Sequence, residues 1–315
     1  MVESVSIMRV VVMGTGAIGG YLGARLAAAG TEVAFIARGA HLAAIRAAGL
    51  RVSSPLGDLH ITPAAATADP ADVGPVDVVL LGIKLYDVEA AARAIAPMVG
   101  DHTAIVCLQN GVDATAIVAR LYGAARVVGG TVMINAEIVS PGVIKHNAMT
   151  LVTVGELDGR TRARLERFVA VANAAGIEMK LSPDIRLEIW RKFLLVAPMA
   201  AISAMTRLPL GRNREHEEIW RLAEQGMREV VAVASSVGVG LTGADVERTL
   251  AFVRGMVPTW KASLAVDLEQ GRRLEIEWLS GAVCRLGEAA KIETPFHRVA
   301  LGVLKPHAAG ARGEP

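Results

Sequence analysis

Hydrophobic residues in the first half of the chain fall into two alternating kinds of segment. Short runs rich in Val and Ile predict buried strands, and Ala-rich stretches with helical spacing lie between them. The expected strands are Met8–Met13, Glu32–Ala37, Val76–Ile83, Thr103–Leu108 and Arg126–Val132, and the expected helices are Ala17–Ala29, Ala40–Ala48, Val88–Met98 and Asp113–Leu121. Such βαβ units predict an α/β fold with a doubly wound, mainly parallel sheet covered by helices on both faces.

The pattern changes in the second half. The segment Ile134–Leu157 is less regular. We expect a helix at Thr161–Ala175 and a strand at Ile177–Leu181 to close the first domain. Beyond Pro183 the sequence is helical almost throughout. The expected helices are Asp184–Thr206, His216–Val237, Gly243–Ala251, Ala262–Gln270 and Leu274–Ala290. We therefore expect an α/β domain over residues 1–182 and an all-helical domain over residues 183–315.

Composition and charge exclude several classes of protein. Of 315 residues 52% are hydrophobic and 20% charged, which excludes a disordered chain. The net charge is +2 and no block of Lys or Arg stands out, which argues against a nucleic-acid partner. The two cysteines, Cys107 and Cys284, are too few for a disulfide framework or a zinc site and fit a reducing compartment.

Two segments imitate membrane signals. Arg9 and the apolar residues up to Ala24 resemble a signal peptide, but five glycines inside that stretch would weaken its helix. The longest apolar run, Phe193–Met205, is shorter than the ~20 residues that a spanning helix needs. We expect a soluble, cytoplasmic protein with no membrane partner.

The first expected strand runs directly into a G-x-G-x-x-G loop that opens the first helix. The first glycine allows the tight turn, the second lets the backbone approach a pyrophosphate, and the third lets helix and strand pack closely. The helix N-terminus offers its free N–H groups to phosphates. A purely structural turn is the alternative. If the loop belongs to a Rossmann-type domain, we expect the dinucleotide to be bound by Gly14, Thr15, Gly16, Ala17, Ile18 and Gly19.

Arg38 follows the second strand, at the place where an acidic residue would bind the ribose 2′-hydroxyl of NAD. A guanidinium there suits the 2′-phosphate of NADP, because it can form two charge-assisted hydrogen bonds to a phosphate. The sequence therefore favours NADP(H) as the cofactor. The alternative is a solvated surface arginine.

Polar residues also follow the next two strands. Lys84 comes after the third strand and Asn110 after the fourth. Ligands of open α/β sheets bind at the carboxyl ends of strands, so Lys84 can reach the phosphate side and Asn110 the nicotinamide or the substrate. Ordinary turn chemistry is equally compatible, since Asn-Gly is a common turn pair.

Lys192 stands near the start of the helical domain, immediately before the apolar run. The residues alone favour a lysine whose stem is buried and whose ammonium reaches water. Likewise, Glu275 alone reads as a solvated helix residue beside Arg272 and Arg273.

From Met8 to about His307 the chain resembles the ketopantoate reductase family, the 2-dehydropantoate 2-reductases. Several motifs carry the resemblance. They are GTGAIGG at Gly14–Gly20, AR at Ala37–Arg38, Lys84, QNG at Gln109–Gly111, W-x-K at Trp190–Lys192, and S-x11-E from Ser263 to Glu275.

The resemblance implies NADPH-dependent reduction of a 2-oxo acid, ketopantoate to pantoate in pantothenate biosynthesis. It implies that Lys192 polarises the keto oxygen and donates the proton, and that Glu275 positions the lysine and substrate hydroxyls. Ser263 would bind the substrate carboxylate, Asn110 would hold the substrate near the nicotinamide, and Lys84 would lie on the cofactor side. The residues themselves predict no metal site, because the histidines are scattered and His216-Glu217 lacks the second histidine of a zinc helix. Amphipathic helices in the second domain leave a homodimer possible.

The sequence departs from the family at three positions where the family has asparagines: Val196, Ala200 and Trp260. The first two share a helix face with Lys192 through i, i+4 and i+8 spacing, and Ser203 is the next polar residue on that face. An apolar wall cannot select a substrate hydroxyl. The expected substrate is therefore a more apolar keto acid, or ketopantoate reduced weakly. Two rival interpretations stand beside this one: a dehydrogenase for hydroxy acids or other alcohols, and a non-catalytic NADP-binding protein.

Overall fold

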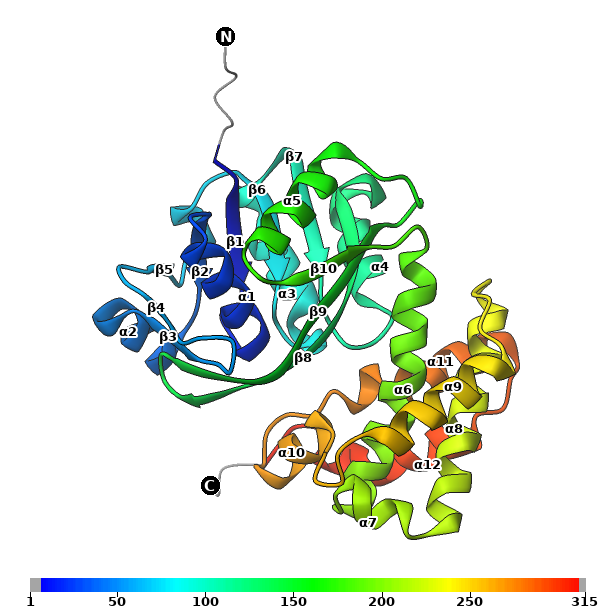
Figure 1. Cartoon of the computed structure of the whole chain (residues 1–315). Coiled ribbons are helices and arrows are strands. Elements are labelled where there is room, and N and C mark those ends of the chain that lie inside the picture. Colours follow the sequence, from blue (N-terminus) through cyan, green and yellow to red (C-terminus); the bar gives the residue numbers. More distant parts are fainter. Residues whose placement is uncertain (1–6, 312–315) are drawn as a thin grey trace. The chain divides into compact units, whose positions relative to one another are not determined.

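The computed structural model describes residues 7–311, so the ends of the expected domains lie outside it. Within those residues a ten-stranded sheet has the order β4-β3-β9-β8-β7-β6-β1-β2-β5, with β10 beside β9 (Figure 1). The strands are β1 Arg9–Met13, β2 Glu32–Ile36, β3 Leu50–Ser53, β4 Leu59–Ile61, β5 Ala65–Thr67, β6 Val76–Leu81, β7 Val99–Cys107, β8 Val127–Ser140, β9 Val143–Glu156 and β10 Glu178–Leu181. The predicted α/β class with a mainly parallel sheet is confirmed.

The sheet reverses its direction of winding between β1 and β6. From β1 the chain crosses through α1 (Ala17–Ala28) to β2 on one side, and α2 (Gly39–Ala48) follows. From β6 it crosses through α3 (Val88–Ala94), β7 and α4 (Ala114–Tyr122) to β8 on the other side. Right-handed crossovers in opposite directions place their helices on opposite faces, with α3 beside α4 and α1 beside α5 (Ala163–Ala174). Ligands of open sheets bind at this reversal point.

The prediction of an irregular segment at Ile134–Leu157 is wrong. This segment belongs to a long antiparallel hairpin of β8 and β9 that turns at Pro141 and Gly142, where Gly142 has φ +77° (Figure 1). Only the first half of β8 is buried on both faces, and its second half is largely exposed. The outer half therefore carries polar residues between apolar ones, and no continuous apolar run signals it.

Short elements also escape the sequence pattern. Strands β3, β4 and β5 are three or four residues long, too short for a periodic signal. The expected helix Val88–Met98 ends at Ala94 and gives way to a 3-10 turn at Ala96–Met98, because Pro97 cannot continue it.

The part of the chain described from Arg186 onward contains helices and no strand. Its elements are α6 Ile185–Thr206, α7 Leu210–Arg214, α8 Glu217–Ser236, α9 Gly243–Gly255, α10 Ser263–Glu269, α11 Ser280–Ala290 and α12 Pro295–Leu304, with a 3-10 turn at Ile276–Trp278. The expected helix Leu274–Ala290 is thus divided, because Leu279 leaves helical geometry at φ −103° and ψ −94°. The prediction omitted α7 and α12.

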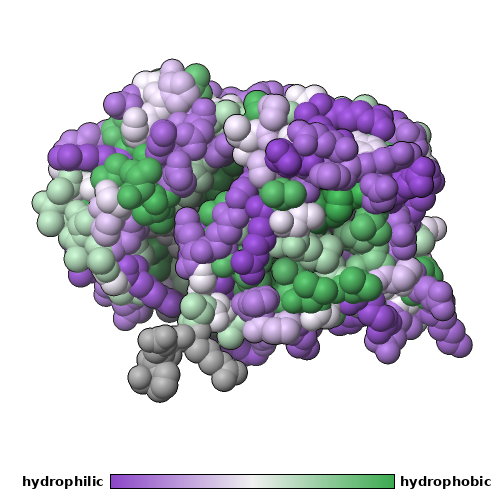
Figure 2. Space-filling model, turned by 90° about the horizontal axis from the view of Figure 1, so that it is seen from below, coloured by the Kyte–Doolittle hydropathy of each residue, from purple (hydrophilic) through white to green (hydrophobic). Residues whose placement is uncertain are grey.

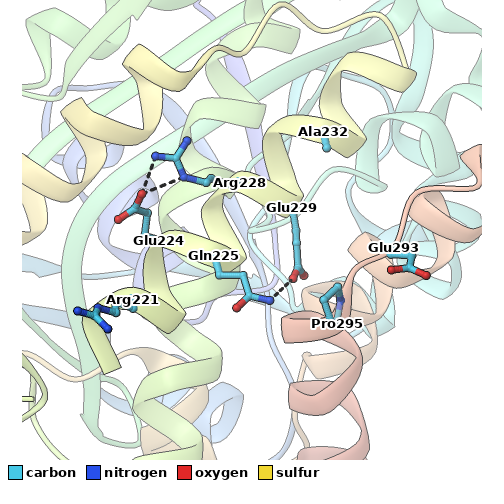
Figure 3. A pocket seen from close by; sticks show the side chains of 8 residues that line it. All are labelled: Arg221, Glu224, Gln225, Arg228, Glu229, Ala232, Glu293 and Pro295. Carbon is cyan, nitrogen blue, oxygen red and sulfur yellow. Dashed lines mark hydrogen bonds and ion pairs between the residues drawn. The ribbon is translucent and has the colours of Figure 1, made fainter. Parts of the chain in front are cut away.

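Close packing around α8 holds the helical core together. A side chain at Gly226 would meet Phe296 at 2.5 Å and Pro198 at 3.1 Å, so the glycine lets α6, α8 and α12 converge. The buried Glu229 carboxylate accepts hydrogen bonds from the backbone N–H groups of Phe296 and His297, and another from Gln225 (Figure 3). These bonds satisfy orphan donors at the start of α12.

The chain divides into two compact units. One runs to Gln109 and resumes over Ala114–Ile185; the other contains Asn110–Asp113 and everything from Arg186 onward. The sequence places the domain boundary between residues 182 and 183 and gives no sign of the short excursion at Asn110–Asp113.

One helix in the described chain, α6, is long and apolar enough to cross a membrane, and 61% of that stretch is buried inside the structure. A core helix has the same properties.

Hydrophobic side chains also gather in patches on one face of the molecule (Figure 2). In the helical unit the exposed apolar residues include Leu208, Phe252, Val257, Val299 and Val303.

Candidate active site

Four neighbouring strands end at one level of the sheet. Met13 of β1 pairs with Ile36 of β2 and with Leu81 of β6, and Leu81 pairs with Cys107 of β7. The residues that follow these strands therefore share one edge. In spatial order they belong to the segments of Asn110, Lys84, the glycine loop and Arg38.

The glycine loop is fixed to the end of β2. The amides of Gly14 and Thr15 both donate to the carbonyl of Ile36, at 3.2 and 3.0 Å, and the Thr15 hydroxyl donates to the same oxygen at 2.9 Å. Both donors of Thr15 are thus bonded to the end of β2, and Thr15 fixes the position of the loop. Gly14 has φ +95°, a conformation that favours glycine. Its added Cβ would also lie 3.2 Å from the backbone of Gly82.

The three motif glycines have different surroundings. A Cβ on Gly16 would meet only the Gly82 carbonyl, at 3.7 Å, so the space above this residue is open. A Cβ on Gly19 would collide with the Gly14 carbonyl and would lie 2.9 Å from Val12 Cγ1, so this glycine sets the contact of α1 with β1. An open backbone surface before a helix N-terminus matches what a pyrophosphate requires.

The first amides of α1 supply the donors for that surface. The helix begins at Ala17 after Gly16, and the first hydrogen bond of the turn runs from the Gly20 amide to the Gly16 carbonyl at 2.7 Å. The amides of Ala17, Ile18 and Gly19 therefore have no acceptor one turn earlier in the helix. The residues present fit a dinucleotide. The sequence prediction did not include Gly82 among the residues that shape the loop. A Cβ added to Gly82 would lie 2.8 Å from the Gly14 carbonyl, so this glycine makes room for the loop. The available signal was a glycine directly after the adjacent strand.

Arg38 is exposed at the start of α2, and its side chain forms no hydrogen bond or ion pair with the described residues. Arg38 comes two residues after Ile36, the last residue of β2, and therefore lies at the β2 end of the shared edge. A guanidinium with no protein partner is available to a phosphate.

Lys84 and Asn110 follow β6 and β7. Lys84 is partly buried at the start of a 3-10 turn, and Asn110 is partly buried in the loop after β7. The buried Gln109 ties the two strand ends together, since its Nε2 donates to the carbonyls of Leu81 at 2.7 Å and Ile83 at 3.3 Å. This bridge, which the sequence pattern did not reveal, fixes the residue beside Asn110.

Lys192 lies near the start of α6 and keeps part of its surface accessible. Even so, desolvation lowers the pKa of its ammonium to about 8, while the charge of Glu275 acts in the opposite direction. A lysine whose pKa lies near neutrality can exchange a proton at working pH.

Glu275 precedes the 3-10 turn at Ile276–Trp278 and is only 6% exposed. The structure therefore excludes the alternative of a solvated helix residue. Ser263, in contrast, is exposed as the first residue of α10. Asn110, Lys192, Ser263 and Glu275 all belong to the helical unit, while the glycine loop, Arg38 and Lys84 belong to the α/β unit.

The face of α6 that continues from Lys192 carries no exposed polar side chain over the next three turns. Val196 is partly buried and Ala200 is 3% exposed. Ser203 is buried, and its hydroxyl accepts the Ala262 amide hydrogen at 3.2 Å. The helix continues through Pro198 to Thr206.

Other features of the described residues carry no comparable chemistry. Both cysteines are buried, and burial raises the pKa of the Cys107 thiol to about 12. No group of three His, Cys, Asp or Glu side chains there could hold a metal ion. An open pocket between α8 and α12 is lined by two arginines that are paired with glutamates. Figure 3 shows the pair of Arg228 with Glu224. Arg221 pairs with Glu217, which lies outside the lining of the pocket.

Known proteins resemble the chain over nearly its whole length. The family model "Ketopantoate reductase PanE/ApbA" matches residues 10–159, and the corresponding C-terminal model matches residues 184–308. The chain belongs to the ketopantoate reductase family. A 2-dehydropantoate 2-reductase of Mesorhizobium japonicum is 34% identical over 95% of this chain and 97% of its own length.

Solved structures of ketopantoate reductases share this fold. A PanE/ApbA family ketopantoate reductase from Ralstonia eutropha superposes with a TM-score of 0.89 at 32% identity, covering 96% of this chain and 98% of its own. D-mandelate dehydrogenase, solved with NADH and anilino(oxo)acetate, superposes with a TM-score of 0.88 at 20% identity, covering 96% and 98%. At that identity the second likeness concerns the fold alone.

Proposed function

We propose that this chain reduces a 2-oxo acid to a 2-hydroxy acid with NADPH, as 2-dehydropantoate 2-reductases do with 2-dehydropantoate. Residues 1–182 would bind NADPH, and residues 183–315 would hold the substrate. The observation that carries the proposal is the pair of Lys192 and Glu275: a lysine with its pKa lowered to about 8, opposed by a buried carboxylate. A lysine whose pKa is shifted by desolvation and by one specific charged partner is typical of a catalytic site.

The α/β unit would hold the cofactor. The open backbone at Gly16 and the amides of Ala17 and Ile18 would receive the pyrophosphate, and Arg38 would pair with the 2′-phosphate. Lys84 would add positive charge at the neighbouring strand end. When bound, the reduced nicotinamide supplies the hydride.

Lys192 would polarise the keto group and then donate a proton to its oxygen. Negative charge grows on that oxygen as the carbonyl carbon is reduced, and a fixed ammonium stabilises it. Proton donation is efficient because the pKa of Lys192 is about 8 rather than 10.5. Glu275 keeps the amine protonated, Ser263 would bind the substrate carboxylate, and Asn110 would orient the keto group.

The wall beside Lys192 favours a second candidate, a 2-oxo acid with a more apolar side chain than ketopantoate. Val196 and Ala200 offer no hydrogen bond, and Ser203 already binds the Ala262 amide. A hydroxyl placed on this wall would lose its water without gaining a partner, whereas a branched or aromatic group would bury apolar surface.

A panel of 2-oxo acids assayed by NADPH consumption tests both candidates. Consumption with no 2-oxo acid in the panel would overturn the proposed activity. A kcat/KM for ketopantoate at least about tenfold above that for branched and aromatic 2-oxo acids would remove the second candidate. A tenfold preference corresponds to about 1.4 kcal/mol, which is the contribution of about one hydrogen bond to the substrate hydroxyl. Assaying the reverse reaction with the matching 2-hydroxy acids and NADP establishes the preferred direction.

A cytoplasmic location and a homodimer complete the proposal. The family of small-molecule reductases supports the first, and apolar side chains on α12, at Val299 and Val303, support the second. Sedimentation at several concentrations, with Val303→Glu as a comparison, tests the dimer; a single monomer at every concentration would exclude it.

A further inference from the structure

The segment Asn110–Asp113 connects β7 to α4, yet it groups with the helical unit while the residues on both sides of it group with the α/β unit. Leu108 is buried in the core of the α/β unit. Val112, four residues later, packs against the core of the helical unit. Gly111 between them has φ +108°, which allows the sharp change of direction.

An ion pair fastens this segment to the helical unit. Arg285 Nη2 on α11 lies 2.8 Å from Asp113 Oδ1 and 2.7 Å from Oδ2. The Asp113 carboxylate is 17% exposed, whereas the Arg285 side chain is 54% exposed. An ion pair with one solvated partner adds little to the free energy of unfolding. We therefore expect the pair to act mainly by holding residues 110–113 in position.

Asn110 therefore lies between two anchors. On one side Gln109 is bonded to the end of β6, and on the other Asp113 is held by α11, the helix that follows the turn after Glu275. We propose that Asp113 and Arg285 are positioning residues that fix Asn110 relative to Lys192 and Glu275. This inference rests on the proposed function, in which Asn110 orients the keto group.

Positioning predicts a specific kinetic pattern. Losing the pair frees Asn110, and a misplaced orienting group costs catalysis rather than cofactor affinity. For Arg285→Gln and Asp113→Asn we expect kcat/KM for the 2-oxo acid to fall about tenfold, with the Kd of NADPH changed less than about threefold. Asparagine is nearly the same size as aspartate, so D113N removes the charge with little change in side-chain volume.

Arg228→Gln is the matched control. Arg228 is 56% exposed and pairs with Glu224 on α8, so its removal breaks an ion pair of similar exposure away from Asn110. We expect its kcat/KM to stay within about twofold of wild type, as for most surface pairs.

Two readouts separate positioning from a structural effect. In an Asn110→Ala background, R285Q should lower kcat/KM by less than about twofold, because residues that act through one another are not additive. In the chain without substrate, R285Q but not R228Q should raise deuterium exchange at the amides of residues 112–114.

Unchanged exchange in R285Q would overturn the proposal, and so would a tenfold loss that persists in the N110A background. If the wild-type chain reduces no 2-oxo acid, the proposed function fails separately, and the exchange measurement alone decides whether the pair anchors the segment.

Discussion

The Glu275 carboxylate opposes the effect of burial on the Lys192 ammonium. Desolvation pulls the pKa of Lys192 down to about 8, and without the charge of Glu275 it would fall further. Both residues lie in the helical unit, Lys192 near the start of α6 and Glu275 before the turn that leads to α11. Because these two effects leave the pKa of Lys192 at about 8, the amine is largely protonated at neutral pH and its proton is easy to transfer.

Removing the amine tests the role of Lys192. General acid catalysis is worth about 10²–10⁴-fold, so we expect Lys192→Ala to lower kcat by that factor. The Kd of NADPH, measured by fluorescence, should change little, because the glycine loop and Arg38 are untouched. A variant that retains more than half of the wild-type kcat would falsify the assignment.

The pH profile tests the coupling of Lys192 to Glu275. Reduction needs the protonated amine, so kcat should decline as the pH rises through about 8. Glu275→Gln removes the charge that raises this pKa, and the decline should move to lower pH. A decline that stays in place in E275Q, or moves to higher pH, would contradict the coupling.

Arg38 should separate the two nicotinamide cofactors. Hydrogen bonds to charged groups contribute about 1.5–3 kcal/mol, so Arg38→Ala should weaken NADPH binding about 10- to 100-fold and leave NADH nearly unchanged. Arg93→Ala, which breaks the exposed pair of Arg93 with Glu89, is the control and should affect neither cofactor. Equal losses for both cofactors in R38A would show that the arginine does not read the 2′-phosphate.

Two glycines of one motif should respond differently to alanine. Gly16 has φ −76° and open space above it, so Gly16→Ala should leave the melting temperature nearly unchanged but weaken dinucleotide binding by at least about tenfold. Gly19→Ala drives a methyl group into the Gly14 carbonyl and should destabilise the fold by about 1–3 kcal/mol. Thermal unfolding and NADPH titration of both variants check this contrast; tight NADPH binding by G16A would remove Gly16 from the phosphate site.

The sequence alone determined the α/β class, the helical second half, and the strand–glycine loop–helix arrangement, because these depend on local periodicity and on glycines needed for backbone geometry. It could not reveal the outer half of the β8–β9 hairpin, whose exposed faces lack an apolar run. Nor could it decide between a solvated and a buried Glu275, since burial depends on residues distant along the chain. Only the tertiary structure decided that Ser203 is occupied by the Ala262 amide and that Asp113 is held by Arg285, because contacts over 59 and 172 residues leave no mark in a local pattern.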